Sequence, residues 1–382
     1  MNDLAPAPID VPEAALDDLR DRLRRTRWPE RETVDDWSQG IPLAYVRELC
    51  ATWADDYDWR RVEAELNGFQ QLRFAGSGAG GEPLGIQVLF APSSEPDAIP
   101  LVLTHGWPGS VVEFLDVIEP LRDPAAHGGD TADAFHVVCP TMPGYGFSDK
   151  PSKPGTGVEH IADMWASLMT ALGYDRFGAQ GGDWGSSVTT ALAMQHPERL
   201  LGIHLNMVSV GPGADAGELT EAEQAAMESM AHYQRWDSGY STQQASRPQT
   251  VGYGLVDSPA AQAAWVVEKF WSWTDNEGHP EDAISRHRLL DNVMHYWLPG
   301  AGASSGRLYW ESFHRRRGGE TAVPMAASSF PKEIFRASRR WAERRFTDIR
   351  HWNELDVGGH FAAFEQPVTF VDEVRTAFRT MR

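Results

Sequence analysis

The chain has 382 residues and a formal net charge of −20, so it is long enough for a large core and strongly acidic. This charge disfavours nucleic acid and anionic membranes as partners, because both bind basic surfaces. Cys50 and Cys139 are too far apart in sequence to indicate a disulfide framework or a metal knuckle. No apolar run approaches the roughly 20 residues of a membrane span, and the acidic start does not resemble a signal peptide. We therefore expect a soluble cytoplasmic protein.

The first 65 residues predict helices. Leu16, Leu19 and Leu23 recur at spacings of three and four, which is typical of an amphipathic helix over 14–25. Similar patterns predict helices over 41–53 and 57–65. The period then changes to two, and the glycine-rich GSGAGGE precedes the strand-like GIQVLF. This change predicts a helical extension that leads into a sheet.

Short apolar runs then alternate with helical patterns. Strands are predicted over 99–106, 135–140, 176–181 and 200–206, and helices over 161–172 and 186–195. Such alternation is typical of a mostly parallel sheet with helices on both faces. Helical patterns replace it over 218–236, 260–273 and 289–296, before strands over 323–328 and 346–352 and a closing helix over 367–380. This helical insertion predicts a lid over a ligand site.

The stretch GAQGGDWGSS places Asp183 where a predicted strand turns into a predicted helix. Small residues flank a central residue in the same way at the nucleophile turn of α/β-hydrolases, where the nucleophile is usually serine. Such a turn projects its central side chain at the carboxyl ends of the strands, where these sheets bind ligands. The alternative is that Asp183 only caps the following helix.

The stretch HGWPGS, residues 105–110, follows the strand over 99–106. In α/β-hydrolases this loop supplies one N–H group of the oxyanion hole, and the residue after the nucleophile supplies the other. The predicted oxyanion-hole donors are thus the backbone amides of Trp107 and Trp184. The alternative is an ordinary turn in which glycine and proline interrupt the chain.

The order nucleophile, acid, histidine along the chain selects the remaining members of a catalytic triad. His360, in GGHFAAFEQP, follows the last predicted strand, and the other histidines, such as His196 and His204, lack that placement. The acid must lie between Asp183 and His360. We favour Glu333 in SFPKEIF, with Asp348 as the alternative.

An aspartate nucleophile indicates attack on a saturated carbon. Its carboxylate is ionised near neutrality, so it can displace a leaving group and form an alkyl ester without a base. Water activated by His360 and oriented by Glu333 would then hydrolyse the ester. A halide leaving group needs N–H donors, whereas an epoxide oxygen needs a proton, which tyrosine can supply. The candidate donors in the insertion are Tyr233, Tyr240, Tyr253, Tyr296 and Tyr309.

Together these motifs resemble the microsomal-type epoxide hydrolases, a family that includes the juvenile-hormone epoxide hydrolases. The resemblance covers nearly the whole chain and includes HGWPGS, PGYGFSD, GGDWGS, WVVEKFWSWTD, NVMHYW, ASSFPKE and GGHFAAFEQP. It implies Asp183 as nucleophile, His360 as general base and Glu333 as charge-relay acid. It also implies that Tyr240 and Tyr309 bind and protonate the epoxide oxygen. Animal microsomal members carry a membrane anchor that this chain lacks, so we expect no membrane association.

The sequence thus predicts an α/β-hydrolase fold with a helical lid and an N-terminal helical extension. The expected units are an extension over 1–95, a core over 96–211 and 321–382, and a lid over 212–320. The expected reaction adds water to an apolar epoxide and gives a vicinal diol, with no cofactor and no metal. A homo-oligomer is left open. The lid tryptophans suggest an apolar, aromatic-lined site; they are Trp236, Trp265, Trp271, Trp273, Trp297 and Trp310.

Two other functions remain open at this stage. A haloalkane or haloacid dehalogenase would use the same aspartate nucleophile and the tryptophan that follows it. A noncatalytic hydrolase-like protein would only bind a ligand, although a complete set of nucleophile, acid and histidine argues against it.

Overall fold

The computed structural model describes residues 3–213, 216–315 and 318–382. Within these residues the strands form one nine-stranded sheet in the order β1-β2-β3-β5-β4-β6-β7-β8-β9. The strands are β1 (Leu4–Pro6), β2 (Gln70–Gly78), β3 (Glu82–Ala91), β4 (Ile99–Thr104), β5 (Phe135–Pro140), β6 (Phe177–Gly181), β7 (Leu200–Leu205), β8 (Met325–Ser329) and β9 (Ile349–Glu354). β1, β2, β3 and β5 pair antiparallel, whereas β5, β4 and β6 to β9 pair parallel. The mostly parallel sheet predicted from the sequence is therefore confirmed.

Helices cover the parallel part of the sheet. α5 packs on α6 and α4 packs on α15, and both pairs also contact the strands. These helices and two short ones are α4 (Leu115–Arg122), α5 (Val158–Ala171), α6 (Asp183–Gln195), α13 (Arg339–Ala342), α14 (Ala362–Glu365) and α15 (Pro367–Arg379). Leu101, Val102 and Leu103 in β4 are fully buried, as expected for a strand that is covered on both faces.

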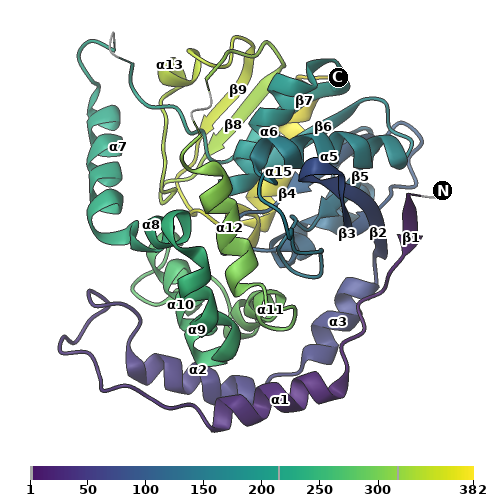
Figure 1. The fold of residues 1–382 in the computed structure, drawn as a ribbon. Helices are drawn as coiled ribbons and strands as arrows, with labels where there is room; N and C mark the ends of the chain where they lie inside the picture. Colours follow the sequence, from purple (N-terminus) through teal and green to yellow (C-terminus); the bar gives the residue numbers. More distant parts are fainter. Residues whose placement is uncertain (1–2, 214–215, 316–317) are drawn as a thin grey trace.

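The N-terminal extension has more than helices. The predicted helices are present as α1 (Glu13–Arg24), α2 (Leu43–Asp55) and α3 (Trp59–Asn67). The predicted strand-like stretches after them are β2 and β3. Together with β1, which was not predicted, they continue the central sheet, so this part of the chain shares the hydrogen-bonding network of the core. Figure 1 shows α1 and α2 along the outer side of the lid helices, far from β1.

The lid is the long insertion between β7 and β8 (Figure 1). Its helices are α7 (Glu221–His232), α8 (Gly239–Ser246), α9 (Pro248–Asp257), α10 (Pro259–Trp273), α11 (Arg286–Trp297) and α12 (Gly302–Ser312). The predicted helix over 218–236 is shorter than expected, because α7 ends at His232 and a π-helical turn, Tyr233–Asp237, follows. Helices α8, α9 and α12 were not predicted, because their glycine-rich and serine-rich sequences show no clear apolar period of 3.6.

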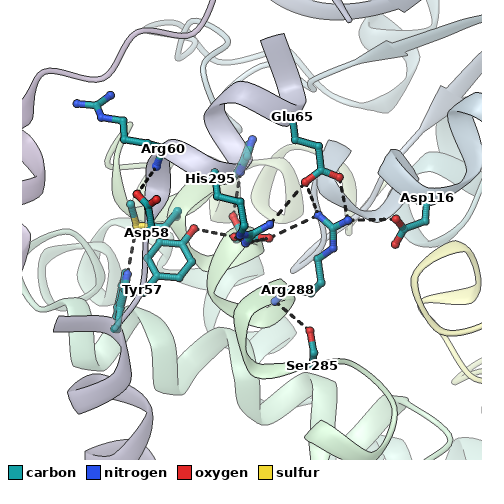
Figure 2. A network of polar contacts seen from close by, with 12 residues as sticks. Tyr57, Asp58, Arg60, Glu65, Asp116, Ser285, Arg288 and His295 are labelled. Atoms are coloured by element: carbon teal, nitrogen blue, oxygen red, sulfur yellow. Dashed lines mark hydrogen bonds and ion pairs between the residues drawn. The ribbon is translucent and has the colours of Figure 1, made fainter. Parts of the chain in front are cut away.

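A polar network joins the extension to the lid. Arg288 of α11 binds both oxygens of Glu65 at 2.9 Å and Asp116 at 3.1 Å, and Figure 2 shows its guanidinium between these two carboxylates. One helical turn further along α11, the fully buried Asp291 accepts hydrogen bonds from Arg61 at 2.6 Å and from the Tyr57 hydroxyl at 2.8 Å. Both ends of α3 are therefore bonded to the lid.

None of the helices in the described parts of the chain has the length and apolar character needed to cross a bilayer. Cellular location and oligomeric state stay predictions.

Candidate active site

Asp183 occupies the turn between β6 and α6. Among the described residues it is the only one other than glycine with a positive φ, at +47°. Its neighbours leave no space for side chains: a Cβ on Gly185 would lie 1.9 Å from the carbonyl oxygen of Thr104, and one on Gly181 would lie 2.2 Å from the carbonyl carbon of Gly185. Such local strain is held by the surrounding packing and is concentrated at functional sites.

The HGWPGS loop after β4 contacts the Asp183 carboxylate. The backbone N–H of Trp107 donates to Asp183 Oδ1 at 2.8 Å. Trp184 follows Asp183 in the first turn of α6, and its amide remains the predicted second donor. Oδ1 is thus the oxygen that this loop binds, and Oδ2 is the oxygen nearest to His360.

His360 follows β9 and lies between two carboxylates. Its Nδ1 is 2.7 Å from Glu333 Oε1, and its Nε2 is 3.5 Å from Asp183 Oδ2. Burial opposes a charge on the imidazole, but Glu333 and Asp183 outweigh it and hold the pKa of His360 well above its usual value. Asp348, the alternative acid, instead pairs with Arg350 at 3.0 Å. The structure therefore brings Asp183, His360 and Glu333 together.

A cavity of about 800 Å³ opens beside Asp183. Three of the five candidate tyrosines, Tyr233, Tyr240 and Tyr309, line it. The other two lie elsewhere: Tyr253 is 71% exposed, and the Tyr296 hydroxyl donates to the carbonyl oxygen of Gly109. The structure thus leaves three of the five tyrosines as candidate proton donors at the cavity.

Aromatic packing fixes the tyrosines that face Asp183. The Tyr240 ring stacks on Trp107 with centroids 4.6 Å apart, and the Tyr309 ring meets Trp184 edge-on at 4.8 Å. The Tyr240 hydroxyl is 3.0 Å from that of Tyr233, whereas the buried Tyr309 hydroxyl makes no hydrogen bond of ordinary length to a described residue. Burial is the main cause that raises the pKa of Tyr240 and of Tyr309 well above its usual value, and the Asp183 charge adds to it. Both are therefore protonated and able to donate.

The cavity is apolar, but not for the reason that the sequence suggested. Its lining contains methionines and the rings of Phe313, Phe335, Phe346 and Trp341. None of the six lid tryptophans is among the described lining residues, and Trp236 and Trp310 are 68% and 49% exposed. Tryptophan content alone could not reveal this, because a helix places such rings on any of its faces.

Near Asp183 the sequence left Tyr233 as one candidate donor among five, and it missed Glu113. Tyr233, in the π-helical turn, is the hydrogen-bond partner of Tyr240. Glu113, three residues after HGWPGS, lines a second and smaller cavity together with Asp183 and His360. The short distance of Glu113 from the motif was the available signal, but a glutamate outside a recognised motif is usually solvated.

These features define an α/β-hydrolase. The sheet is mostly parallel with helices on both faces, a strained nucleophile turn follows one strand, and a histidine and a carboxylate follow the last two strands. The chain matches the family described as "alpha/beta hydrolase fold" over residues 99–241 and the family described as "Epoxide hydrolase N terminus" over residues 4–114.

The similar proteins agree with these matches. A relative from Stigmatella aurantiaca with an epoxide hydrolase name is 52% identical, covering 99% of this chain and 86% of that protein. "Epoxide hydrolase 1" of Oryctolagus cuniculus is 31% identical, covering 95% and 86%. The crystal structure of juvenile hormone epoxide hydrolase from Bombyx mori is 27% identical with a TM-score of 0.91, covering 99% and 95%. The Aspergillus niger epoxide hydrolase structure is 27% identical with a TM-score of 0.86, covering 99% and 96%. The chain belongs to the epoxide hydrolase family.

Proposed function

We propose that this enzyme hydrolyses an apolar epoxide to a vicinal diol through an alkyl ester on Asp183. In the first step Asp183 Oδ2 attacks a ring carbon, the carbon–oxygen bond breaks, and the ring oxygen takes a proton from Tyr240 or Tyr309. The main support for this proposal is the position of the Asp183 carboxylate. Asp183 faces a tyrosine-lined cavity and also lies 3.5 Å from the imidazole that Glu333 orients.

The charge balance around His360 explains how the two steps are separated. The Asp183 and Glu333 carboxylates hold a proton on His360 in the free enzyme by raising its pKa. Esterification removes the Asp183 charge, so the pKa of His360 falls and the imidazole becomes a base. The proton that it releases through solvent replaces the one that the tyrosine gave. His360 can then take a proton from the attacking water.

Ester hydrolysis uses the second set of contacts. Water adds to Asp183 Cγ as its proton passes to His360 Nε2, and the negative charge develops on Oδ1. The Trp107 amide at 2.8 Å and the predicted Trp184 amide would stabilise this charge. Collapse of the tetrahedral species breaks the bond to the alkyl oxygen, which takes the proton from His360. The carboxylic acid left on Asp183 then passes the second proton of the water to His360, which restores the carboxylate and the protonated imidazole of the free enzyme as the diol departs.

An oxygen-18 experiment tests the covalent route. One turnover in labelled water, with enzyme in excess, should place the label in Asp183 and leave the first diol unlabelled. His360→Gln should stop at the ester and increase the protein mass by the mass of the epoxide. Label in the diol at the first turnover would overturn the proposal. Styrene oxide, long-chain epoxides and terpene epoxides would define the substrate range, with Asp183→Ala as the inactive control.

The tyrosines are tested by replacing both Tyr240 and Tyr309 with phenylalanine. Epoxide turnover should collapse, because the ring oxygen would leave without a proton. Halide release from a haloalkane would not need these hydroxyl groups. Unchanged epoxide turnover in the double variant would overturn their assigned role.

A further inference from the structure

A second, small cavity also borders Asp183. It measures about 20 Å³ and is lined mainly by the HGWPGS loop, Glu113, Gln180 and His360. Among the described residues, Asp183 alone lines both this cavity and the large cavity that contains the tyrosines. The nucleophile therefore borders two compartments, a large one that contains the tyrosines and a small one that contains Glu113, Gln180 and His360.

The small cavity has the size and polarity for one water molecule. A water site needs roughly 10–15 Å³ and two to four polar partners. Besides His360 and Asp183, the lining includes Gln180, whose Oε1 is buried and makes no hydrogen bond to a described residue. The Nε2 of Gln180 donates to Asn206 Oδ1 at 2.6 Å, so the amide is oriented and Oε1 is its free acceptor.

Glu113 is held at this cavity by the HGWPGS loop. It belongs to a 3₁₀ turn, Val111–Phe114, whose first residue follows Ser110. Its carboxyl group lies over Gly109: a Cβ on Gly109 would be 1.5 Å from Glu113 Oε1. Only glycine at 109 leaves room for this position. Burial, with the Asp183 charge adding to it, raises the pKa of Glu113 to about 8, so the group faces the cavity as a neutral acid near neutrality.

We propose that this small cavity binds the hydrolytic water and that Glu113 and Gln180 are its positioning residues. The proposal rests on the covalent route given above. Glu113 and Gln180 hold the water beside His360 Nε2 and outside the large cavity. The water oxygen forms its bond to Asp183 Cγ while its proton passes to His360, and Glu113 neither gains nor loses a proton overall. Water can thus reach the ester while the alkyl group still fills the large cavity.

Glu113→Gln tests the assignment by separating the two chemical steps. Alkylation should stay within about twofold of the unaltered enzyme, because Glu113 does not line the large cavity. Ester hydrolysis should slow by about 10²-fold, the usual effect of misplacing a reactant by 1 Å. The alkyl-enzyme should then accumulate in rapid-quench mass spectrometry. The readout is the ratio of the hydrolysis rate to the alkylation rate, which a general loss of stability would not change.

Glu365→Gln is the matched control. Glu365 is likewise a half-buried acid near His360, and burial raises its pKa to about 7. It is not in the lining of the small cavity, and its oxygens accept the backbone N–H groups of Asp275 and Phe361. This variant should keep the ratio of the two rates within about threefold. An equal change of the ratio in both variants, or no change in Glu113→Gln, would overturn the role of Glu113.

A crystal structure and the His360→Gln variant test the water site independently of Glu113→Gln. A high-resolution crystal structure of the unaltered protein should show a water in the small cavity within hydrogen-bond distance of His360 and Glu113. A cavity without water would overturn the proposal even if Glu113→Gln fails to fold. If His360→Gln gives no alkyl-enzyme, the covalent route itself fails, and this assignment fails with it. A normal ester in His360→Gln with an unchanged ratio in Glu113→Gln would refute only the assignment.

Discussion

Replacing Asp291 with alanine should weaken the junction between the extension and the lid. The Asp291 side chain is fully buried and accepts hydrogen bonds from Arg61 and from the Tyr57 hydroxyl. The substitution leaves the guanidinium and the mostly buried hydroxyl without this partner. Breaking a buried ion pair in this way costs about 3–5 kcal/mol. Because the Arg61 side chain is 43% exposed and regains solvent, the low end of that range, about 3 kcal/mol, is the expected loss.

The expected change in melting temperature follows from the size of the chain. An unfolding entropy of about 2.1 cal/mol/K per residue amounts to roughly 0.8 kcal/mol/K for 382 residues. A loss of about 3 kcal/mol therefore lowers the Tm by about 4 °C. Differential scanning calorimetry measures this shift, and limited trypsin digestion measures local opening at the arginines between α1 and α2.

Asp257→Ala is the matched control for Asp291→Ala. Asp257 also joins the lid to the extension, through Arg22 at 3.2 Å, but its side chain is 85% exposed. Exposed pairs contribute about 0–1 kcal/mol, so its Tm should change by about 1 °C or less. Equal shifts for the two variants would refute the reasoning that burial makes Asp291 the stabilising contact.

Three other substitutions have defined outcomes. Tyr309→Phe should slow alkylation by about 10²-fold, the low end for general acids, as measured by single-turnover mass spectrometry; an unchanged rate would exclude Tyr309 as a proton donor. Gly185→Ala should lower the free energy of unfolding by about 3 kcal/mol or more, because the new Cβ would lie 1.9 Å from the Thr104 carbonyl oxygen. An unchanged midpoint of urea unfolding would contradict the packing argument. Arg340, the main cause, lowers the pKa of Glu223 from 4.5 to about 2. The Glu223 carboxylate therefore adds stability above pH 4.5 that is lost as the pH falls toward 2. Glu223→Gln should flatten the acid side of the plot of Tm against pH. An unaltered slope in this variant would contradict the contribution of Glu223.

The sequence was informative about features that depend on neighbouring residues, namely secondary structure and short motifs. Alternating strands and helices predicted the mostly parallel sheet, and the long lapse in that alternation predicted the lid. Asp183 could be singled out because a strained turn needs small neighbours in its own few residues. The family could be recognised for the same reason, since its motifs are short and continuous.

The sequence was less informative where several segments meet. Tyr240 and Tyr309 lie on α8 and α12, which were not predicted as helices, and the pattern left five tyrosines open. The apolar lining came from methionines and other rings, and none of the six lid tryptophans is among the described lining residues. In the extension the sequence did not predict β1, which joins the sheet through long-range pairing with β2.

By itself the sequence determined the fold class, the carboxylate at the nucleophile turn and the order of the triad candidates, because these depend on local conformation and on chain order. The tertiary structure alone decided which acid contacts His360, which tyrosines face Asp183 and how the extension is bonded to the lid. It also placed a second, small cavity and the Glu113 carboxyl next to the nucleophile. The physical reason is that burial, ion pairing and cavity shape arise from residues brought together by folding, and residue spacing along the chain carries little information about them.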